Sequence, residues 1–92
     1  MREEIDGIFD LLVLNKYIIG CFKAYLFGSI ITNKPFPNDI DILIIYENEE
    51  QPKIIRNIFE KVSYLPIHFL FLTEKEENEI KFILEQGCLK IL

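Results

Sequence analysis

Residues 39–46, DIDILIIY, constrain the fold more than any other part of the sequence. β-Branched residues dominate this segment, which is typical of a strand. Because successive strand residues point to opposite faces, Leu43 and Ile45 share one face with the two acidic residues, and the other face is apolar throughout. Beyond residue 41 the strand is therefore apolar on both faces, which predicts a buried position within a sheet.

The two acidic residues of this strand, Asp39 and Asp41, are two positions apart, so both carboxylates face the same way, about 6–7 Å apart. Their mutual repulsion is about 2–3 kcal/mol at an effective dielectric constant of about 20. A divalent cation between them removes this repulsion, and Mg²⁺ prefers such oxygen ligands. Spacing alone leaves two interpretations open, a metal site or a solvated start of a strand.

Two further strands are expected on either side of this one in the chain. Residues 22–27, FKAYLF, read as a strand that runs directly into Gly28-Ser29. Residues 31–38 contain two prolines and two asparagines and are expected to form a loop. Residues 67–72, IHFLFL, read as a third strand.

Three helices are expected from apolar residues at helical spacing. The first covers residues 3–18 and closes at Gly20, with an inward stripe of Ile5, Ile8, Phe9 and Leu12. The second has Pro52 in its first turn and an inward stripe of Ile54, Ile55, Ile58, Phe59 and Val62. The third begins with a capping box of Thr73 and Glu76, ends near Gln86 with Gly87 as its C-terminal cap, and has Ile80, Ile83 and Leu84 facing inward. Residues 88–92 are too short for a prediction.

Length and composition set limits on function. A chain of 92 residues is expected to be a single domain, 1–92, with an α/β (α+β) order of α-β-β-α-β-α. Its 15 acidic and 10 basic residues give a net charge of −5 without a basic stripe, so stable nucleic-acid binding is not expected. Cys21 and Cys88 are expected to be reduced, buried side chains. With no signal pattern and no apolar run near the ~20 residues that span a bilayer, a soluble cytoplasmic protein is expected.

The dipeptide Gly28-Ser29 adds weight to the metal interpretation. A glycine at the end of a strand lets the backbone approach closely, and the serine that follows offers a hydroxyl and an amide to a phosphate oxygen. Alone, such a pair is usually a turn. Here it stands between one predicted strand and a loop that leads to Asp39 and Asp41 on the next strand.

This combination resembles the DNA polymerase β-type nucleotidyltransferase superfamily, whose signature is a Gly-Ser pair, a spacer of this length and an Asp-x-Asp strand. Residues 25–46, YLFGSIITNKPFPNDIDILIIY, are similar to the small bacterial branch, the minimal nucleotidyltransferases that pair with HEPN-type proteins. The resemblance implies a small mixed sheet flanked by helices. It also implies transfer of a nucleoside monophosphate, such as AMP from ATP, with Gly28 and Ser29 holding the triphosphate and Asp39 and Asp41 binding Mg²⁺.

Two positions depart from that pattern. Active members usually have a third carboxylate on the next strand, where this chain has His68, and an arginine soon after the Gly-Ser pair, where this chain has only Lys34 nearby. Three interpretations of His68 stay open. It is an ordinary strand histidine, a general base that takes a proton near neutral pH, or a metal ligand that favours Mn²⁺ or Zn²⁺ over Mg²⁺.

Two functions follow from these residues. The first is a nucleotidyltransferase that binds Mg²⁺ (or Mn²⁺) with an NTP, most simply ATP, and modifies a partner protein. The alternative is a catalytically silent module on the same fold, an antitoxin-like half of a protein pair. A HEPN-like protein or a second copy is the expected partner. A receiver-like signalling domain fits less well, because its acidic cluster lies at the C-terminal ends of parallel strands, whereas Asp39 and Asp41 open theirs.

Overall fold

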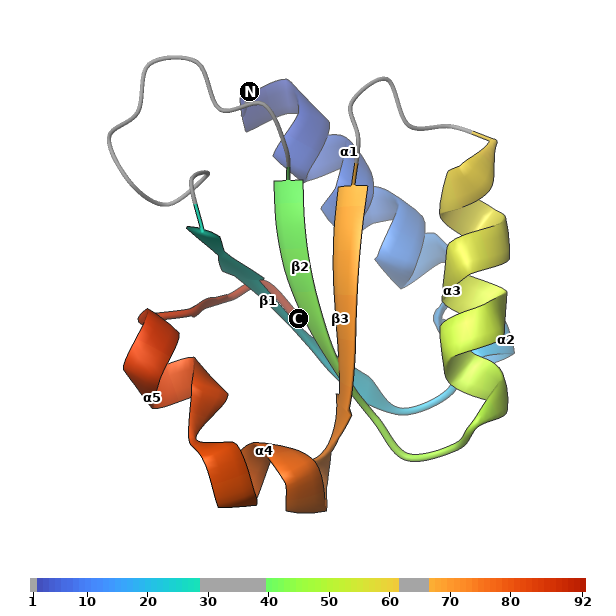
Figure 1. The fold of residues 1–92 in the computed structure, drawn as a ribbon. Helices are drawn as coiled ribbons and strands as arrows, with labels where there is room; N and C mark the ends of the chain where they lie inside the picture. Colours follow the sequence, from blue (N-terminus) through green and yellow to red (C-terminus); the bar gives the residue numbers. More distant parts are fainter. Residues whose placement is uncertain (1, 29–39, 62–66) are drawn as a thin grey trace.

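The fold is a four-stranded sheet with helices on both faces (Figure 1). The structure, a computed structural model, describes residues 2–28, 40–61 and 67–92. Its elements are α1 (Arg2–Leu14), α2 (Lys16–Ile19), β1 (Phe22–Phe27), β2 (Ile40–Tyr46), α3 (Glu50–Glu60), β3 (Ile67–Thr73), α4 (Glu74–Ile80), α5 (Phe82–Gln86) and β4 (Leu89–Lys90). The strand order is β3-β2-β1-β4, with β2 parallel to β3 and β1 antiparallel to both β2 and β4. This confirms the expected small α+β fold with a mixed sheet.

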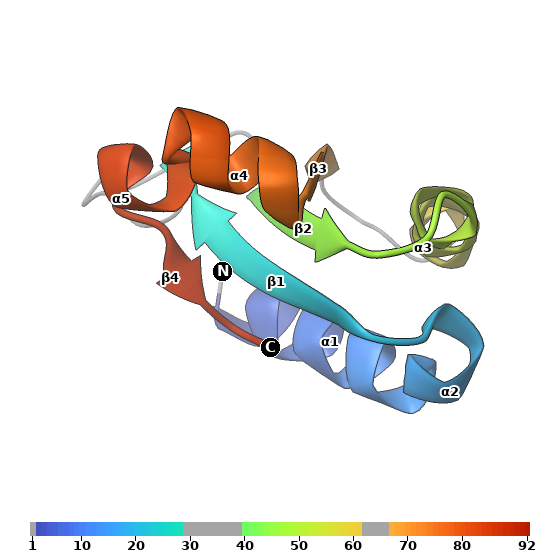
Figure 2. The same cartoon turned by 90° about the horizontal axis from the view of Figure 1, so that it is seen from below.

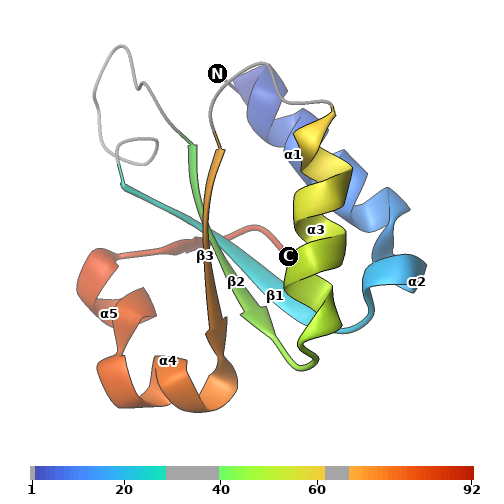
Figure 3. The same cartoon turned by 45° about the vertical axis from the view of Figure 1, so that its right-hand side comes forward.

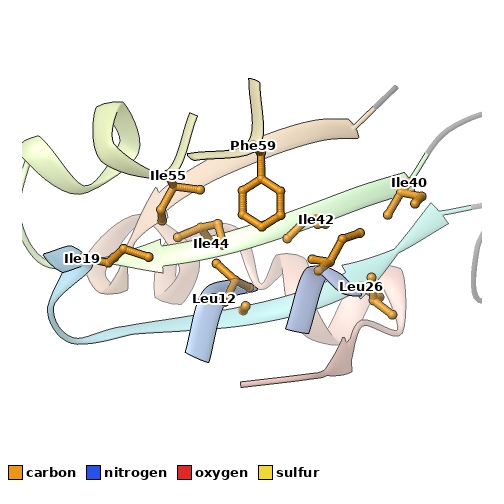
Figure 4. Packing of buried hydrophobic residues seen from close by; sticks show 10 residues of the cluster. Leu12, Ile19, Leu26, Ile40, Ile42, Ile44, Ile55 and Phe59 are labelled. Atoms are coloured by element: carbon orange, nitrogen blue, oxygen red, sulfur yellow. The ribbon is translucent and has the colours of Figure 1, made fainter. Parts of the chain in front are cut away.

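Strand β2 is buried on both faces, as its sequence predicts. Ile42, Leu43, Ile44 and Ile45 are each at most 3% exposed. Ile42 and Ile44 belong to the larger apolar cluster, which Ile55 and Phe59 of α3 cover (Figure 4). Leu43 and Ile45 belong to a second cluster on the other face. Two cores therefore share one strand, and the alternation of its side chains separates them.

The helices divide between the two faces of the sheet. Helices α1, α2 and α3 lie on one side and α4 and α5 on the other (Figures 2 and 3). Ile8, Leu12 and Ile19 bring α1 and α2 onto the larger cluster. Phe82 and Ile83 bring α5 onto the smaller one. None of the described helices is both long and apolar enough to cross a bilayer.

The first predicted helix is divided in two, which the sequence pattern missed. The Asn15 side chain donates from Nδ2 to the Leu11 carbonyl at 2.8 Å, so Asn15 ends α1 and α2 begins at Lys16. The inward position predicted for Phe9 is wrong, since this side chain is 38% exposed, whereas Ile8 and Leu12 are buried. Ile8 and Leu12 are four apart and occupy the centre of the buried stripe, and Phe9 lies beside it.

The predicted helix from Thr73 to Gln86 is also divided. Its capping box between Thr73 and Glu76 and its cap at Gly87 are confirmed. Lys81 has a left-handed backbone with φ of 57°, so α4 ends there and α5 turns to place Phe82 and Ile83 on the sheet. The inward positions predicted for Ile80 and Leu84 are therefore wrong, with 53% and 81% exposure.

The structure changes the expectations for residues 88–92 and for the cysteines, and some other expectations concern residues that it does not describe. Residues 88–92 contain β4, which pairs with Tyr25 and Leu26 of β1. The burial expected for Cys21 is wrong because its side chain is exposed, and Cys88 is half-buried; both thiols are free. Burial, together with the nearby Glu77 carboxylate, raises the pKa of the Cys88 thiol.

The predicted loop 31–38, Val62 and the Ile5 side chain lie outside the described part of the chain.

The side chain of Gln51 connects three segments at the end of β2 that is remote from Asp41. Its Oε1 accepts from the backbone N–H groups of Glu47 at 2.7 Å and Asn48 at 3.0 Å. Its Nε2 donates to the carbonyls of Ile19 at 2.9 Å and Cys21 at 2.7 Å. Gln51 is 4% exposed, and these bonds satisfy a buried amide that would otherwise be costly. It ties the start of α3 to the connection between α2 and β1.

We expect Gln51→Ala to lower the free energy of unfolding by about 2–4 kcal/mol, because it removes these bonds and leaves buried backbone groups without partners. Urea unfolding followed by circular dichroism measures the change. Gln86→Ala is the matched control, since Gln86 is exposed at the end of α5 and should change stability by less than about 0.5 kcal/mol. Equal effects of the two variants would contradict the role assigned to Gln51.

Candidate functional site

The candidate site lies at one corner of the sheet, where β1 ends and β2 and β3 begin. In the antiparallel pair, Asp41 of β2 is the register partner of Phe27, the last residue of β1. In the parallel pair, Asp41 is the register partner of His68 near the start of β3. Register partners on neighbouring strands present their side chains to the same face of a sheet. Phe27, Asp41 and His68 therefore form one row across three strands.

Gly28 follows Phe27 and has a backbone that suits only glycine. Its φ is +76°, in the left-handed region where a Cβ is unfavourable. A Cβ built at this position would overlap Oδ2 of Asp41 and lie 3.2 Å from its Cγ. The backbone of Gly28 and the carboxylate of Asp41 are thus in close contact.

His68 lies beside Asp41 and away from the core. Its side chain is exposed, and it shares one strand face with Leu70 and Leu72, which pack into the smaller cluster with Leu43. The row of Asp41 and His68 therefore faces the side of the sheet that carries α4 and α5. The structure makes His68 the register partner of Asp41 on the next strand, which is the strand where the family resemblance implies a third carboxylate.

An aromatic pair borders the row on the same face of the sheet. The rings of Phe27 and Phe82 meet edge to face with centroids 4.9 Å apart. Both side chains are half-buried and belong to the smaller cluster. The sequence did not single out Phe82, because the break at Lys81 that turns it toward the sheet is a tertiary feature. The pair gives the corner an apolar border next to a carboxylate.

Two of the predicted site residues, Ser29 and Asp39, lie outside the described residues. In the part of the chain that is described, no group of three His, Cys, Asp or Glu side chains could hold a metal ion. Asp41 and His68 supply one oxygen and one nitrogen donor from adjacent strands. The expectation that Asp39 completes a metal site with Asp41 falls on a residue outside the described part of the chain.

The corner thus combines a carboxylate at the start of a central buried strand with a glycine that directly follows the antiparallel neighbour. The chain matches the family model described as Polymerase beta, Nucleotidyltransferase, over residues 9–89. This match covers most of the sequence, and the protein belongs to that family. Comparison with curated proteins gives no match. A receiver-like sheet is excluded, since β1 runs antiparallel to β2.

We expect Gly28→Ala to destabilise the protein by about 2–4 kcal/mol, from strain at positive φ and from overlap with the Asp41 carboxylate. Gly87→Ala is the matched control: φ at Gly87 is also positive, at +62°, but a Cβ there meets nothing within 4 Å. It should cost only about 1 kcal/mol. Urea unfolding of both variants separates the overlap from the strain.

A further variant, Gly28→Ala with Asp41→Ala, tests the contact directly. Without the carboxylate the added methyl group has room, since the Asp41 Cβ lies at an ordinary 3.5 Å. The double variant should therefore be at least as stable as Gly28→Ala alone. If the double variant loses as much free energy of unfolding as Gly28→Ala and Asp41→Ala lose together, Gly28 and Asp41 do not contact each other.

Proposed function

We propose that this nucleotidyltransferase-family protein binds a Mg²⁺–nucleoside triphosphate, with ATP as the simplest candidate, at the corner formed by Gly28, Ser29, Asp39 and Asp41. The observation that carries the proposal is the close contact between the Gly28 backbone and the Asp41 carboxylate in a chain of this family. A glycine at that position leaves its amide accessible to a phosphate oxygen. The reaction we propose is transfer of a nucleoside monophosphate to a partner protein.

The donor chemistry at the corner fits a divalent cation. Asp41 is half-buried at the start of β2, and His68 lies beside it in register. Asp39 and Asp41 would hold the ion through oxygen atoms, which suits Mg²⁺, and His68 beside them would extend the choice to Mn²⁺. When bound, the ion would neutralise negative charge on the phosphates during transfer.

The residues of the chain would act on the rest of the reaction. The backbone of Gly28 and the hydroxyl of Ser29 would orient the triphosphate so that an acceptor hydroxyl faces the α-phosphorus. A bond forms from the acceptor oxygen to the α-phosphorus, the bond to the β-phosphate oxygen breaks, and pyrophosphate leaves. In this mechanism the exposed imidazole of His68 accepts the hydroxyl proton, which is the role of a general base.

A second function has a specific observation in its favour. His68 is the register partner of Asp41 at the place where the family resemblance implies a third carboxylate. Without that carboxylate the chain would bind nucleotide and metal without turnover. The protein would then be a catalytically silent, antitoxin-like module of the minimal nucleotidyltransferase branch, acting on a HEPN-type partner. Release of pyrophosphate from ATP separates the two functions.

We expect the double variant Asp39→Asn/Asp41→Asn to lose Mg²⁺-dependent ATP binding while the fold remains intact or becomes slightly more stable, because the substitution removes the repulsion between two carboxylates. Titration calorimetry with ATP and Mg²⁺ measures binding, and urea unfolding measures stability. Glu47→Gln/Glu49→Gln is the matched control: it makes the same change of charge at exposed residues beyond the opposite end of β2. Unchanged affinity in the aspartate variant would remove the proposed metal site.

Substitution of His68 separates the enzyme from the silent module. We expect His68→Asp to strengthen Mg²⁺ binding and to raise or create nucleotidyl transfer, because it completes an all-oxygen site. If the wild-type protein is active through an imidazole base, His68→Ala should lower the rate by about 10²–10⁴-fold. In a silent protein, His68→Ala should leave nucleotide binding almost unchanged. Weaker Mg²⁺ binding in His68→Asp would place His68 outside the site.

A further inference from the structure

The aromatic pair of Phe27 and Phe82 is the open end of the smaller apolar cluster. Leu43, at the centre of that cluster, is fully buried, whereas both rings of the pair are half-buried. The rings meet edge to face, with an interplanar angle of 89°. Such a contact covers one face of one ring only. The pair therefore keeps aromatic surface accessible on the β1 side of Asp41, on the sheet face to which its carboxylate belongs.

Hydrogen bonds on both sides of Phe82 hold its backbone in place at the start of α5. The Glu77 carboxylate accepts from the backbone N–H of Ile83 at 3.0 Å, and the Glu77 carbonyl accepts from the N–H of Lys81 at 2.7 Å. The N–H of Cys88 donates to the Ile83 carbonyl at 3.0 Å. The residues before and after Phe82 are thus both fixed. A side chain held in this way loses little conformational entropy when a ligand packs against it.

The pair is close enough to Asp41 for one ligand to contact both. Phe27 and Asp41 are register partners, and side chains in such positions start about 4.5–5.5 Å apart. The ring of Phe82 lies a further 4.9 Å from that of Phe27, at the end of β1 where α5 lies (Figure 2). Phe82 is therefore on the order of 10 Å from the carboxylate. In a nucleotide bound through a cation, the ion, the α-phosphate and the ribose separate a carboxylate from the base, and a distance of this order has room for them.

We propose that the Phe27–Phe82 pair is the binding site for the base of the nucleotide, which stacks on the accessible ring surface. The proposal rests on the proposed binding of a nucleoside triphosphate at the corner. Every nucleobase has a π face that stacks on an aromatic side chain, and one such contact typically changes affinity by about 5- to 100-fold. The base then lies on the β1 side of Asp41, and the β3 side, where His68 is exposed, stays open for the acceptor.

Two ligands, one with a base and one without, test the proposal in calorimetric titrations of the full chain with Mg²⁺. The ligands are ATP and inorganic tripolyphosphate, and the wild-type protein should bind both. Phe82→Leu keeps an apolar side chain but has no ring, so it should lower the affinity for ATP about tenfold or more and change that for tripolyphosphate less than about twofold. Phe82→Tyr keeps the ring and should retain the affinity for ATP.

Phe71→Leu is the matched control. Phe71 is also half-buried in an aromatic pair, with Phe69, but it packs against the larger cluster on the other face of the sheet. The same substitution there should leave both affinities unchanged. Circular dichroism and urea unfolding show whether each variant is folded at the temperature of the titration.

Proton NMR of bound ATP gives a readout that a purely structural role of Phe82 would not change. Ring currents should shift the adenine ring protons upfield in the wild-type protein and in Phe82→Tyr, but not in Phe82→Leu. Unshifted adenine protons in the wild-type complex would overturn the base site even if Phe82→Leu is unstable. In a folded Phe82→Leu, an unchanged affinity for ATP, or an equal loss for ATP and tripolyphosphate, would overturn it while nucleotide binding stands. A wild-type protein that binds neither ligand would overturn the proposed function and the base site with it.

Discussion

The structure depends on the burial of β2 on both of its faces. Four consecutive residues of this strand, 42–45, are inaccessible or nearly so, and each of the two apolar clusters contains two of them. At about 25 cal/mol per Å² of apolar surface, such a strand contributes more to stability than any other element of its length. The neighbours are then determined by the need to cover it: β1 and β3 on its edges, α1 and α3 on one face, α5 on the other.

The candidate site follows from the point at which that burial ends. Asp41 is the residue at which one face of β2 changes from apolar to charged, and it has apolar Phe27 on one side and polar His68 on the other. The carboxylate is therefore held by a strand that cannot shift without exposing its apolar residues. The close contact with Gly28 adds a second restraint, because the backbone of β1 occupies the space next to the carboxylate. The strand and the Gly28 backbone together fix the position of the Asp41 carboxylate.

Most of the strands could be predicted from the sequence, because alternation and β-branched residues are local signals. The register that sets Asp41 between Phe27 and His68 depends on pairing between strands, which local signals do not give. The pairing of Asp41 with His68 is consistent with that reading of the third strand. The helix breaks at Asn15 and Lys81 could not be predicted in this way. The break at Asn15 depends on a side-chain hydrogen bond to Leu11 that competes with the helix. The break at Lys81 depends on the packing of Phe82 against Phe27. Strand β4 was missed because its two residues are ordered by β1 and not by their own propensity.

The two helix breaks have different consequences for the surface. The break at Lys81 allows Phe82 and Ile83 to reach the sheet and leaves Ile80 and Leu84 exposed as separate positions. The break at Asn15 does not return the outer residues of α1 and α2 to the core, because Ile8, Leu12 and Ile19 already fill the space above β1 and β2. A domain of this size has too little interior for both stripes of such a helix pair. The outer residues of these two helices therefore stay on the surface of the domain, where exposed apolar side chains are common.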